Sequence, residues 1–176
     1  MEKRLVNTHR DCPARLVPTG DPITIPAGTF LTLTQAMGSS FTVVVDGNMA
    51  RIGGEDADAL GLIIEPLEFP ATTAPADEID EEHVWFALRS VFDPEIPVNI
   101  ADLGLIYNVT LERNKVHINM TLTAPGCGMG PVLVEEVKDR VATVPNVEAV
   151  DVDLVFDPPW SRDMMSEAAQ LELGVF

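Results

Sequence analysis

The pattern of hydrophobic and polar positions is most regular in the second half of the chain. Between residues 116 and 123, apolar and polar residues alternate strictly: Val116, Ile118, Met120 and Leu122 against His117, Asn119, Thr121 and Thr123. A period of two predicts a strand with one buried and one polar face. After Pro131, apolar residues recur at spacings of three and four as far as Val144, which predicts a helix with one apolar face. A glycine-rich turn joins the two elements.

Similar patterns predict the other elements between residues 79 and 176. The acidic run that begins at Asp80 predicts a helix start, and Asp93-Pro94 ends that helix. Alternation over residues 105–111 and 150–156 predicts two further strands, and Ser161 is expected to cap a last helix that runs to Leu173. The predicted order is α-β-β-α-β-α, which is an α+β domain with its helices on one face of a small sheet.

The first half of the chain shows short β-like runs between turn signals. They cover residues 15–17, 23–25, 30–34 and 41–45, and Asp46-Gly47 predicts a hairpin into residues 49–52. Residues 55–60 are expected to form one helical turn. The pattern over residues 1–65 therefore predicts a small antiparallel β-barrel or β-roll module. Residues 66–78 contain three prolines and no periodicity, so they predict a linker to the domain at 79–176.

Composition and charge exclude several classes of partner. The formal net charge of −17 argues against binding to nucleic acid or to an anionic membrane surface, because phosphate binding needs a basic surface. The sequence contains neither an apolar run of about 18 residues nor a signal-peptide pattern. We therefore expect a soluble cytoplasmic protein with reduced thiols.

Cys127 is the leading candidate for chemistry. It lies in the glycine-rich turn just before the predicted helix, where backbone N–H groups favour a thiolate over a thiol. A self-contained zinc or iron–sulfur site normally needs about four ligands, and the chain has no C-x-x-C pattern. One thiolate is still sufficient to hold a labile cluster that a second subunit or a partner shares. The alternative is that Cys127 is simply a small residue in a tight turn.

The other candidate residues have structural alternatives of similar weight. Asp93 and Glu95 lie in a proline-flanked loop, where they serve either as metal ligands, as partners of the Cys127 turn, or as turn formers. Cys12 is a candidate ligand because the nearby Arg10 favours its thiolate. It is the weaker candidate, since an unreactive thiol is at least as good an interpretation. A thiol-dependent enzyme needs a base near Cys127. His117 is about 20 Å upstream on an extended strand, so a solvated histidine is the better interpretation.

Three separated motifs in the second half carry a family resemblance. The runs at residues 93–107 (DPEIPVNIADLGLIY), 120–127 (MTLTAPGC) and 157–160 (DPPW) together resemble the iron–sulfur cluster assembly (FSCA) domain family. Its hallmarks are a D-P-E loop, a D-L-G-L-[IV] strand start and a T-x-x-x-C turn, and they occur here in that order. The resemblance covers about residues 79–176. Residues 10–12, 25–29 and 56–61 look like the N-terminal extension of the SufT subgroup of that family.

The resemblance implies an accessory factor in iron–sulfur protein maturation rather than an enzyme. It implies that Cys127 is a transient ligand for iron or a cluster, with Asp93 and Glu95 beside it, and that no cofactor is tightly bound. The implied partners are apo iron–sulfur client proteins and other cluster assembly factors. A second copy of the chain, which would form a homodimer, is a further possible partner. Two alternatives remain: an adaptor that docks clients without chemistry, and a thiol-dependent enzyme.

Overall fold

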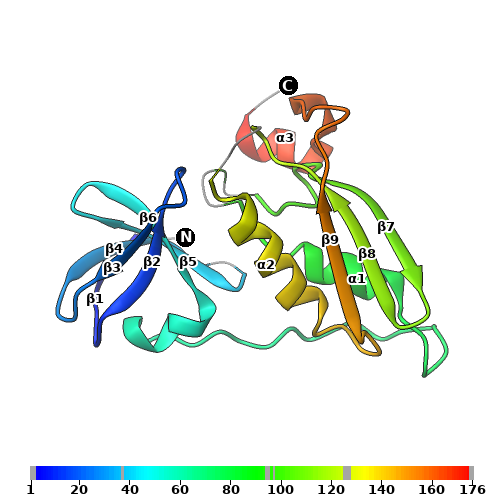
Figure 1. Ribbon diagram of the computed structural model, residues 1–176, viewed down its shortest axis with the longest axis horizontal. Helices are drawn as coiled ribbons and strands as arrows, with labels where there is room; N and C mark the ends of the chain where they lie inside the picture. The colour runs from blue at the N-terminus through cyan, green and yellow to red at the C-terminus, as the bar shows by residue number, and fades with distance from the viewer. Residues whose placement is uncertain (1–2, 37, 94–95, 97, 125–127, 175–176) are drawn as a thin grey trace. The chain divides into compact units, whose positions relative to one another are not determined.

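The computed structural model describes residues 3–36, 38–93, 96, 98–124 and 128–174. The chain divides into two compact units, with the boundary between Pro66 and Leu67 (Figure 1). We describe each unit by itself. That residues 1–65, 66–78 and 79–176 act as module, linker and independent domain stays a prediction. No helix of the described ranges is long and apolar enough to cross a membrane.

The first unit is one antiparallel sheet followed by a short helix. Its strands are β1 (Arg4–Asn7), β2 (Cys12–Leu16), β3 (Pro22–Ile25), β4 (Phe30–Gln35), β5 (Ser40–Val45) and β6 (Asn48–Gly53), in the order β1-β4-β5-β6-β2-β3. Among the described residues β1 and β3 are the end strands and do not pair, so a closed barrel is not confirmed. A 3₁₀ helix, η1 (Gly54–Leu60), follows where one helical turn was predicted.

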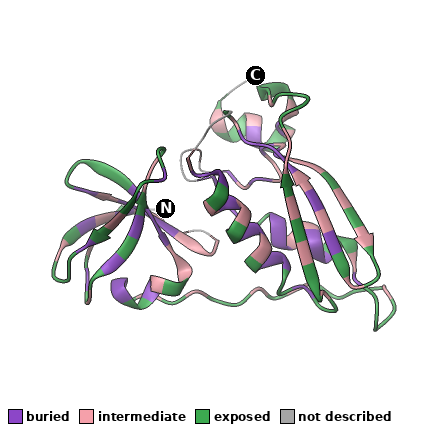
Figure 2. Cartoon of the chain, viewed as in Figure 1, coloured by how far each residue is buried: buried purple, intermediate pink, exposed green. Residues whose placement is uncertain are grey.

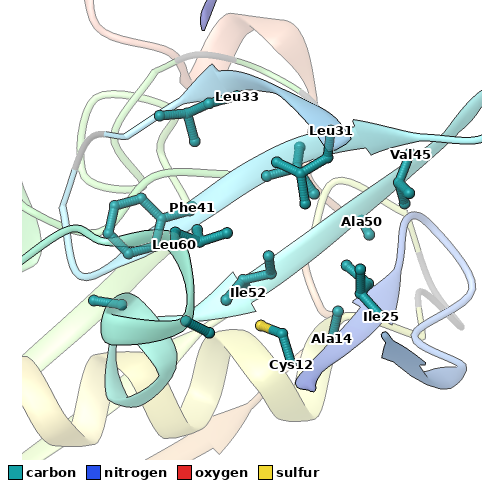
Figure 3. Close-up of a cluster of buried hydrophobic side chains, with 13 residues drawn as sticks. Cys12, Ala14, Ile25, Leu31, Leu33, Phe41, Val45, Ala50, Ile52 and Leu60 are labelled. Atoms are coloured by element: carbon teal, nitrogen blue, oxygen red, sulfur yellow. The ribbon is translucent and has the colours of Figure 1, made fainter. Parts of the chain in front are cut away.

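The β5–β6 hairpin forms at the predicted Asp46-Gly47 turn. Both residues have positive φ, 50° for Asp46 and 79° for Gly47, as a two-residue hairpin turn requires. Val45 then pairs with Asn48 and Phe41 with Ile52. The core of the unit collects the inward-facing residues of these strands and the apolar residues of η1: Cys12, Ala14, Ile25, Leu31, Leu33, Phe41, Val43, Val45, Ala50, Ile52, Ala57, Ala59 and Leu60 (Figure 3).

The second unit has the predicted order of helices and strands. Its elements are α1 (Glu81–Leu88), β7 (Ile106–Glu112), β8 (Lys115–Met120), α2 (Gly130–Val141), β9 (Ala149–Leu154), the 3₁₀ helix η2 (Arg162–Met164) and α3 (Glu167–Leu173). The sheet order is β7-β8-β9, with β7 antiparallel and β9 parallel to β8. Val116, Ile118 and Met120 are completely buried, and α1 and α2 pack beside one another on the same sheet (Figure 1).

The helix boundaries differ from the prediction at three places. The first helix ends at Leu88, so Asp93 does not terminate it. The helix α2 ends at Val141, although Val144 stays buried in the following turn. Ser161 caps no α-helix: extended backbone at Met165 interrupts the segment, and the Ser166 side chain accepts the cap hydrogen bond from the Ala169 N–H instead.

The proline-rich segment before α1 has no regular secondary structure but is anchored to the second unit. The Phe69 ring lies 5.2 Å from the His83 ring and 5.5 Å from the Phe86 ring. His83 Nε2 is 2.7 Å from the Pro70 carbonyl oxygen. The Asn146 side-chain amide donates to the carbonyl of Glu78 at 2.9 Å. The segment is thus attached at both ends, although most of its residues are exposed (Figure 2).

Candidate functional site

Two of the three leading site residues lie outside the described residues. These are Cys127 and Glu95, so their assigned roles stay predictions. The structure describes the chain on both sides of Cys127, as far as Ala124 before it and from Gly128 after it. Asp93 is described and is 7% exposed. Its N–H donates to the Val98 carbonyl at 3.3 Å, and these two residues close the base of the loop that carries Glu95.

The N-terminus of α2, three residues after Cys127, has no side-chain cap. The cap position is Met129, which makes no capping hydrogen bond, and the first turn contains no acidic residue. Such a helix end leaves backbone N–H groups and the positive end of the helix dipole without a side-chain acceptor. A Cβ atom on Gly130 would lie 2.9 Å from the Leu122 Cδ1 atom, so the helix begins in close contact with the end of β8. The described start of α2 therefore presents backbone N–H groups that no side chain caps.

Two of the sequence motifs contact one another directly. The Trp160 indole N–H donates to the Leu103 carbonyl at 2.7 Å, and the Tyr107 hydroxyl donates to the Pro158 carbonyl at 2.6 Å. Gly104 lies between them with φ +78°, against the backbone of Met164. The D-L-G-L strand start is therefore held in place by the D-P-P-W segment. The sequence pointed to both motifs but not to this contact.

The start of β7 and the end of β9 both meet the end of β8. The Thr121 N–H donates to the Leu105 carbonyl at 2.8 Å, and the Val155 N–H donates to the Met120 carbonyl at 2.8 Å. The turn that carries Cys127 therefore leaves the sheet from a point that is fixed on both sides. Thr121 was expected on the polar face of its strand, yet it is fully buried.

The environment of Cys12 contradicts the expectation of a readily formed thiolate. The residue is fully buried in the core of the first unit (Figure 3). Burial, and after it the carboxylate of Asp56, raise the pKa of the Cys12 thiol to about 11, although Arg10 lowers it. Arg10 is itself bound by carboxylates: Nε and Nη2 donate to Asp58 at 2.9 and 2.7 Å, and Nη2 also donates to Asp56 at 3.0 Å. Its influence on the thiol is therefore outweighed.

The three N-terminal motif segments come together around this thiol. Arg10 binds Asp58, the Asp11 carboxylate accepts a hydrogen bond from the Ala27 N–H at 2.9 Å, and the His9 N–H donates to the Ala59 carbonyl at 2.7 Å. These contacts give Arg10 and Asp11 a structural role in the first unit. Cys12 therefore belongs to the core of the first unit, and its weak role as a metal ligand stays a prediction.

Native Cys12 should resist alkylation. At pH 8, iodoacetamide should modify Cys12 about 100-fold more slowly in the folded protein than in urea. The reason is that only a small fraction of the folded molecules carries the Cys12 thiolate, and the sulfur is inaccessible. Peptide mass spectrometry after timed labelling measures this rate separately from that of Cys127. Equal rates in the folded and unfolded protein would show that Cys12 is exposed and restore it as a candidate ligand.

Two of the three histidines, His83 and His117, lie close to polar atoms of the second unit. His117 is half-exposed on the outer face of the sheet, where Nε2 lies 3.2 Å from Asn119 Oδ1 and 3.2 Å from Asp153 Oδ2. His83 is buried against Pro70. Within the described ranges, no three or more histidine, cysteine or acidic side chains are grouped closely enough to hold a metal ion.

Comparison with known proteins places the second unit in a recognised group. A family model described as "Iron-sulfur cluster assembly protein" matches residues 81–153. A "Fe-S protein maturation auxiliary factor" of Porphyromonas gingivalis is 52% identical over 95 residues, which cover 53% of this chain and 90% of that protein. The "Fe-S protein maturation auxiliary factor SufT" of Staphylococcus aureus is 43% identical over 86 residues, which cover 48% of this chain and 98% of that protein.

A solved structure supports the fold of the same unit. The crystal structure of a domain of unknown function, DUF59, from Bacillus anthracis is 41% identical in sequence, with a TM-score of 0.52. The likeness covers 55% of this chain and 92% of that chain. The three similar proteins each match about half of this chain and nearly all of their own length.

Proposed function

Because the chain belongs to the family of iron–sulfur cluster assembly proteins, as the motifs of its second half predicted, we propose that it is an accessory factor in iron–sulfur protein maturation. One observation carries this proposal. The chain is 52% and 43% identical to two maturation auxiliary factors and covers 90% and 98% of their lengths. The likeness therefore extends over their whole fold rather than over a short motif.

The Cys127 thiolate is the proposed contact with the cargo. Thiolates are the preferred ligands of iron–sulfur clusters, and a cluster needs about four of them. A single thiolate supplies one, so the remaining ligands come from the client or from a second copy of the chain. The uncapped N-terminus of α2 supports this role, since it favours the anionic form of sulfur. Asp93 and Glu95 are proposed to complete the site. The cluster is cargo that passes through the protein.

The proposed partners are apo iron–sulfur proteins and other assembly factors. Relatives that carry the name auxiliary factor support a role without turnover of a small molecule, so we do not assign an enzymatic activity. A homodimer that shares one cluster, and a cytoplasmic location, stay predictions from the sequence.

An adaptor that docks clients without sulfur chemistry is the second candidate. It is favoured by the net charge of −17 and by exposed carboxylates such as Asp151 and Asp153 on the outer face of the sheet. Such a surface attracts basic proteins, and its binding weakens with salt. The two candidates differ in one respect: the adaptor tolerates the loss of the Cys127 thiol.

Deletion of the gene tests the proposed function without reference to any residue. Activities of iron–sulfur enzymes should fall in the deleted cells, while enzymes without a cluster keep theirs, and the full-length chain should restore the loss. Protein levels of the measured enzymes provide the control for expression. Undiminished iron–sulfur enzyme activity under iron limitation and oxidative stress would contradict an accessory role in maturation.

A further inference from the structure

One face of α1 contacts the proline-rich segment that precedes the helix. The face consists of the cap residue Asp80 together with His83 and Phe86, which follow one another at spacings of three and are therefore neighbours on the helix surface. We call these three residues the docking face. Val84 and Leu88, which are completely buried, belong to the side of α1 that packs into the core. The helix thus has a second contact surface besides its core side.

An aromatic ring and a backbone carbonyl of the segment lie on the docking face. The Phe69 ring is 5.2 Å from the His83 ring and 5.5 Å from the Phe86 ring, tilted against both. His83 Nε2 donates to the Pro70 carbonyl at 2.7 Å, since a carbonyl oxygen can only accept. His83 is 4% exposed, so this hydrogen bond gives its buried N–H group a partner. The helix therefore binds both the side chain and the backbone of the segment.

A hydroxyl group makes the third contact. The Thr72 hydroxyl donates to the Asp80 carboxylate at the start of α1. Beyond this point the segment is held by a different element, because the Asn146 amide donates to the carbonyls of Ala76 and Glu78 at 3.1 and 2.9 Å. The part of the segment on the docking face is therefore held separately from the part that leads into the helix.

The segment has the features of a bound peptide. Among the described residues, no hydrogen bond between backbone groups involves residues 67–74, and residues 70–73 are exposed. Proline-rich chains of this kind are extended before they bind, and they dock on aromatic-lined surfaces of proteins. The family model begins at residue 81, so α1 belongs to the family domain and the segment precedes it. Because few contacts hold the segment, its release costs little free energy.

We propose that the docking face binds an extended segment of a partner protein in which proline follows an aromatic residue. Residues 69–72 occupy the face in the free chain as an internal ligand, and the partner segment displaces them. A second copy of the chain is not the expected partner, because the segment of each copy is tethered beside its own α1 at a high effective concentration. The same tether sets how tightly a partner must bind.

A labelled peptide tests the docking face on the full-length protein. The probe is a fluorescein-labelled peptide with the sequence of residues 67–77, and its binding is followed by fluorescence anisotropy. Phe69→Ala removes the internal ligand's ring, and a combined Phe69→Ala and Phe86→Ala variant also removes a ring of the docking face. Phe30→Ala is the matched control, since Phe30 is 67% exposed on β4 of the first unit. A second peptide has alanine in place of its phenylalanine.

Phe69→Ala should bind the peptide about tenfold more tightly than the wild type and Phe30→Ala do, because the tethered segment competes with the peptide in those two proteins. Binding should weaken about tenfold in the combined variant, and also with the peptide that lacks the phenylalanine ring, because both changes remove the aromatic contact. The thermal midpoint by circular dichroism should stay within about 4 °C of the wild type in each variant.

Three results would overturn the proposal. The first is equal affinity of the peptide for Phe69→Ala and the wild type, or binding to neither. The second is undiminished binding to the combined variant, which would place the peptide elsewhere on the molecule. The third is loss of the folded second unit in Phe69→Ala, which would make the segment a structural part of that unit. Neither iron nor sulfide is present, so these results do not depend on the proposed function.

Discussion

Cells that produce Cys127→Ser should have iron–sulfur enzyme activities as low as cells that lack the protein. The thiolate is the proposed bond between the chain and its cargo, and a serine hydroxyl does not ionise near neutral pH and is a poor ligand for iron in clusters. The loss should therefore be nearly complete rather than partial. It is measured as the activity of iron–sulfur enzymes, relative to enzymes without a cluster, at equal amounts of the variant and wild-type chains.

Cys12→Ala provides the matched control for this variant. It also removes one of the chain's two thiols, but from the core of the first unit, where the thiol is fully buried. Cells with Cys12→Ala should mature their iron–sulfur enzymes normally, provided that the protein accumulates. Full activity with Cys127→Ser would eliminate the ligand role and favour the adaptor. A shared loss in both variants would point to folding rather than to sulfur chemistry.

Gly104→Ala should unfold the second unit more readily than other single-methyl changes. Gly104 has φ +78°, which an alanine adopts only with strain, and its new Cβ atom would overlap the carbonyl oxygen of Met164 and lie 2.7 Å from its carbonyl carbon. Backbone atoms cannot move aside as a flexible side chain can. We expect the free energy of unfolding to fall by about 2–4 kcal/mol.

Tryptophan fluorescence reports this unit alone, because the chain has two tryptophans and both, Trp85 and Trp160, lie in it. Gly174→Ala is the control, since Gly174 has φ +68° and no atom within 4 Å of a built Cβ. It should lose only about 1 kcal/mol, and the difference between the variants measures the clash with Met164. Equal urea midpoints for the two variants would show that the Met164 contact does not hold the strand start.

Periodicity was sufficient to predict the second unit. The alternation around Val116, Ile118 and Met120 and the apolar spacing after Pro131 are local signals, and the elements they predicted are present. The hairpin at Asp46-Gly47 was predictable for the same reason, because its turn depends on two adjacent residues. The N-terminal strand β1 was missed, since Leu5 and Val6 are too few for an alternating pattern.

The remaining differences come from contacts between distant parts of the chain. Arg10 lies two residues before Cys12 in sequence, but the carboxylates of Asp56 and Asp58 bind it, and burial is the largest influence on the pKa of the thiol. Thr121 continues an alternating run, yet it lies beyond the end of its strand and is buried. No local pattern reports such contacts. The roles of Cys127, Asp93 and Glu95 came from turn chemistry and family resemblance, and they stay predictions.

Anaerobic reconstitution with iron and sulfide tests the central claim most directly. Wild type, Cys127→Ser and Cys12→Ala are compared by visible absorbance, iron content and molecular mass, with a purified apo client present and absent. The account predicts a labile cluster in the wild type and in Cys12→Ala, held by two copies or by the chain with its client, and none in Cys127→Ser. A wild type that binds no iron under either condition, or a Cys127→Ser variant that binds as much as the wild type, would contradict it.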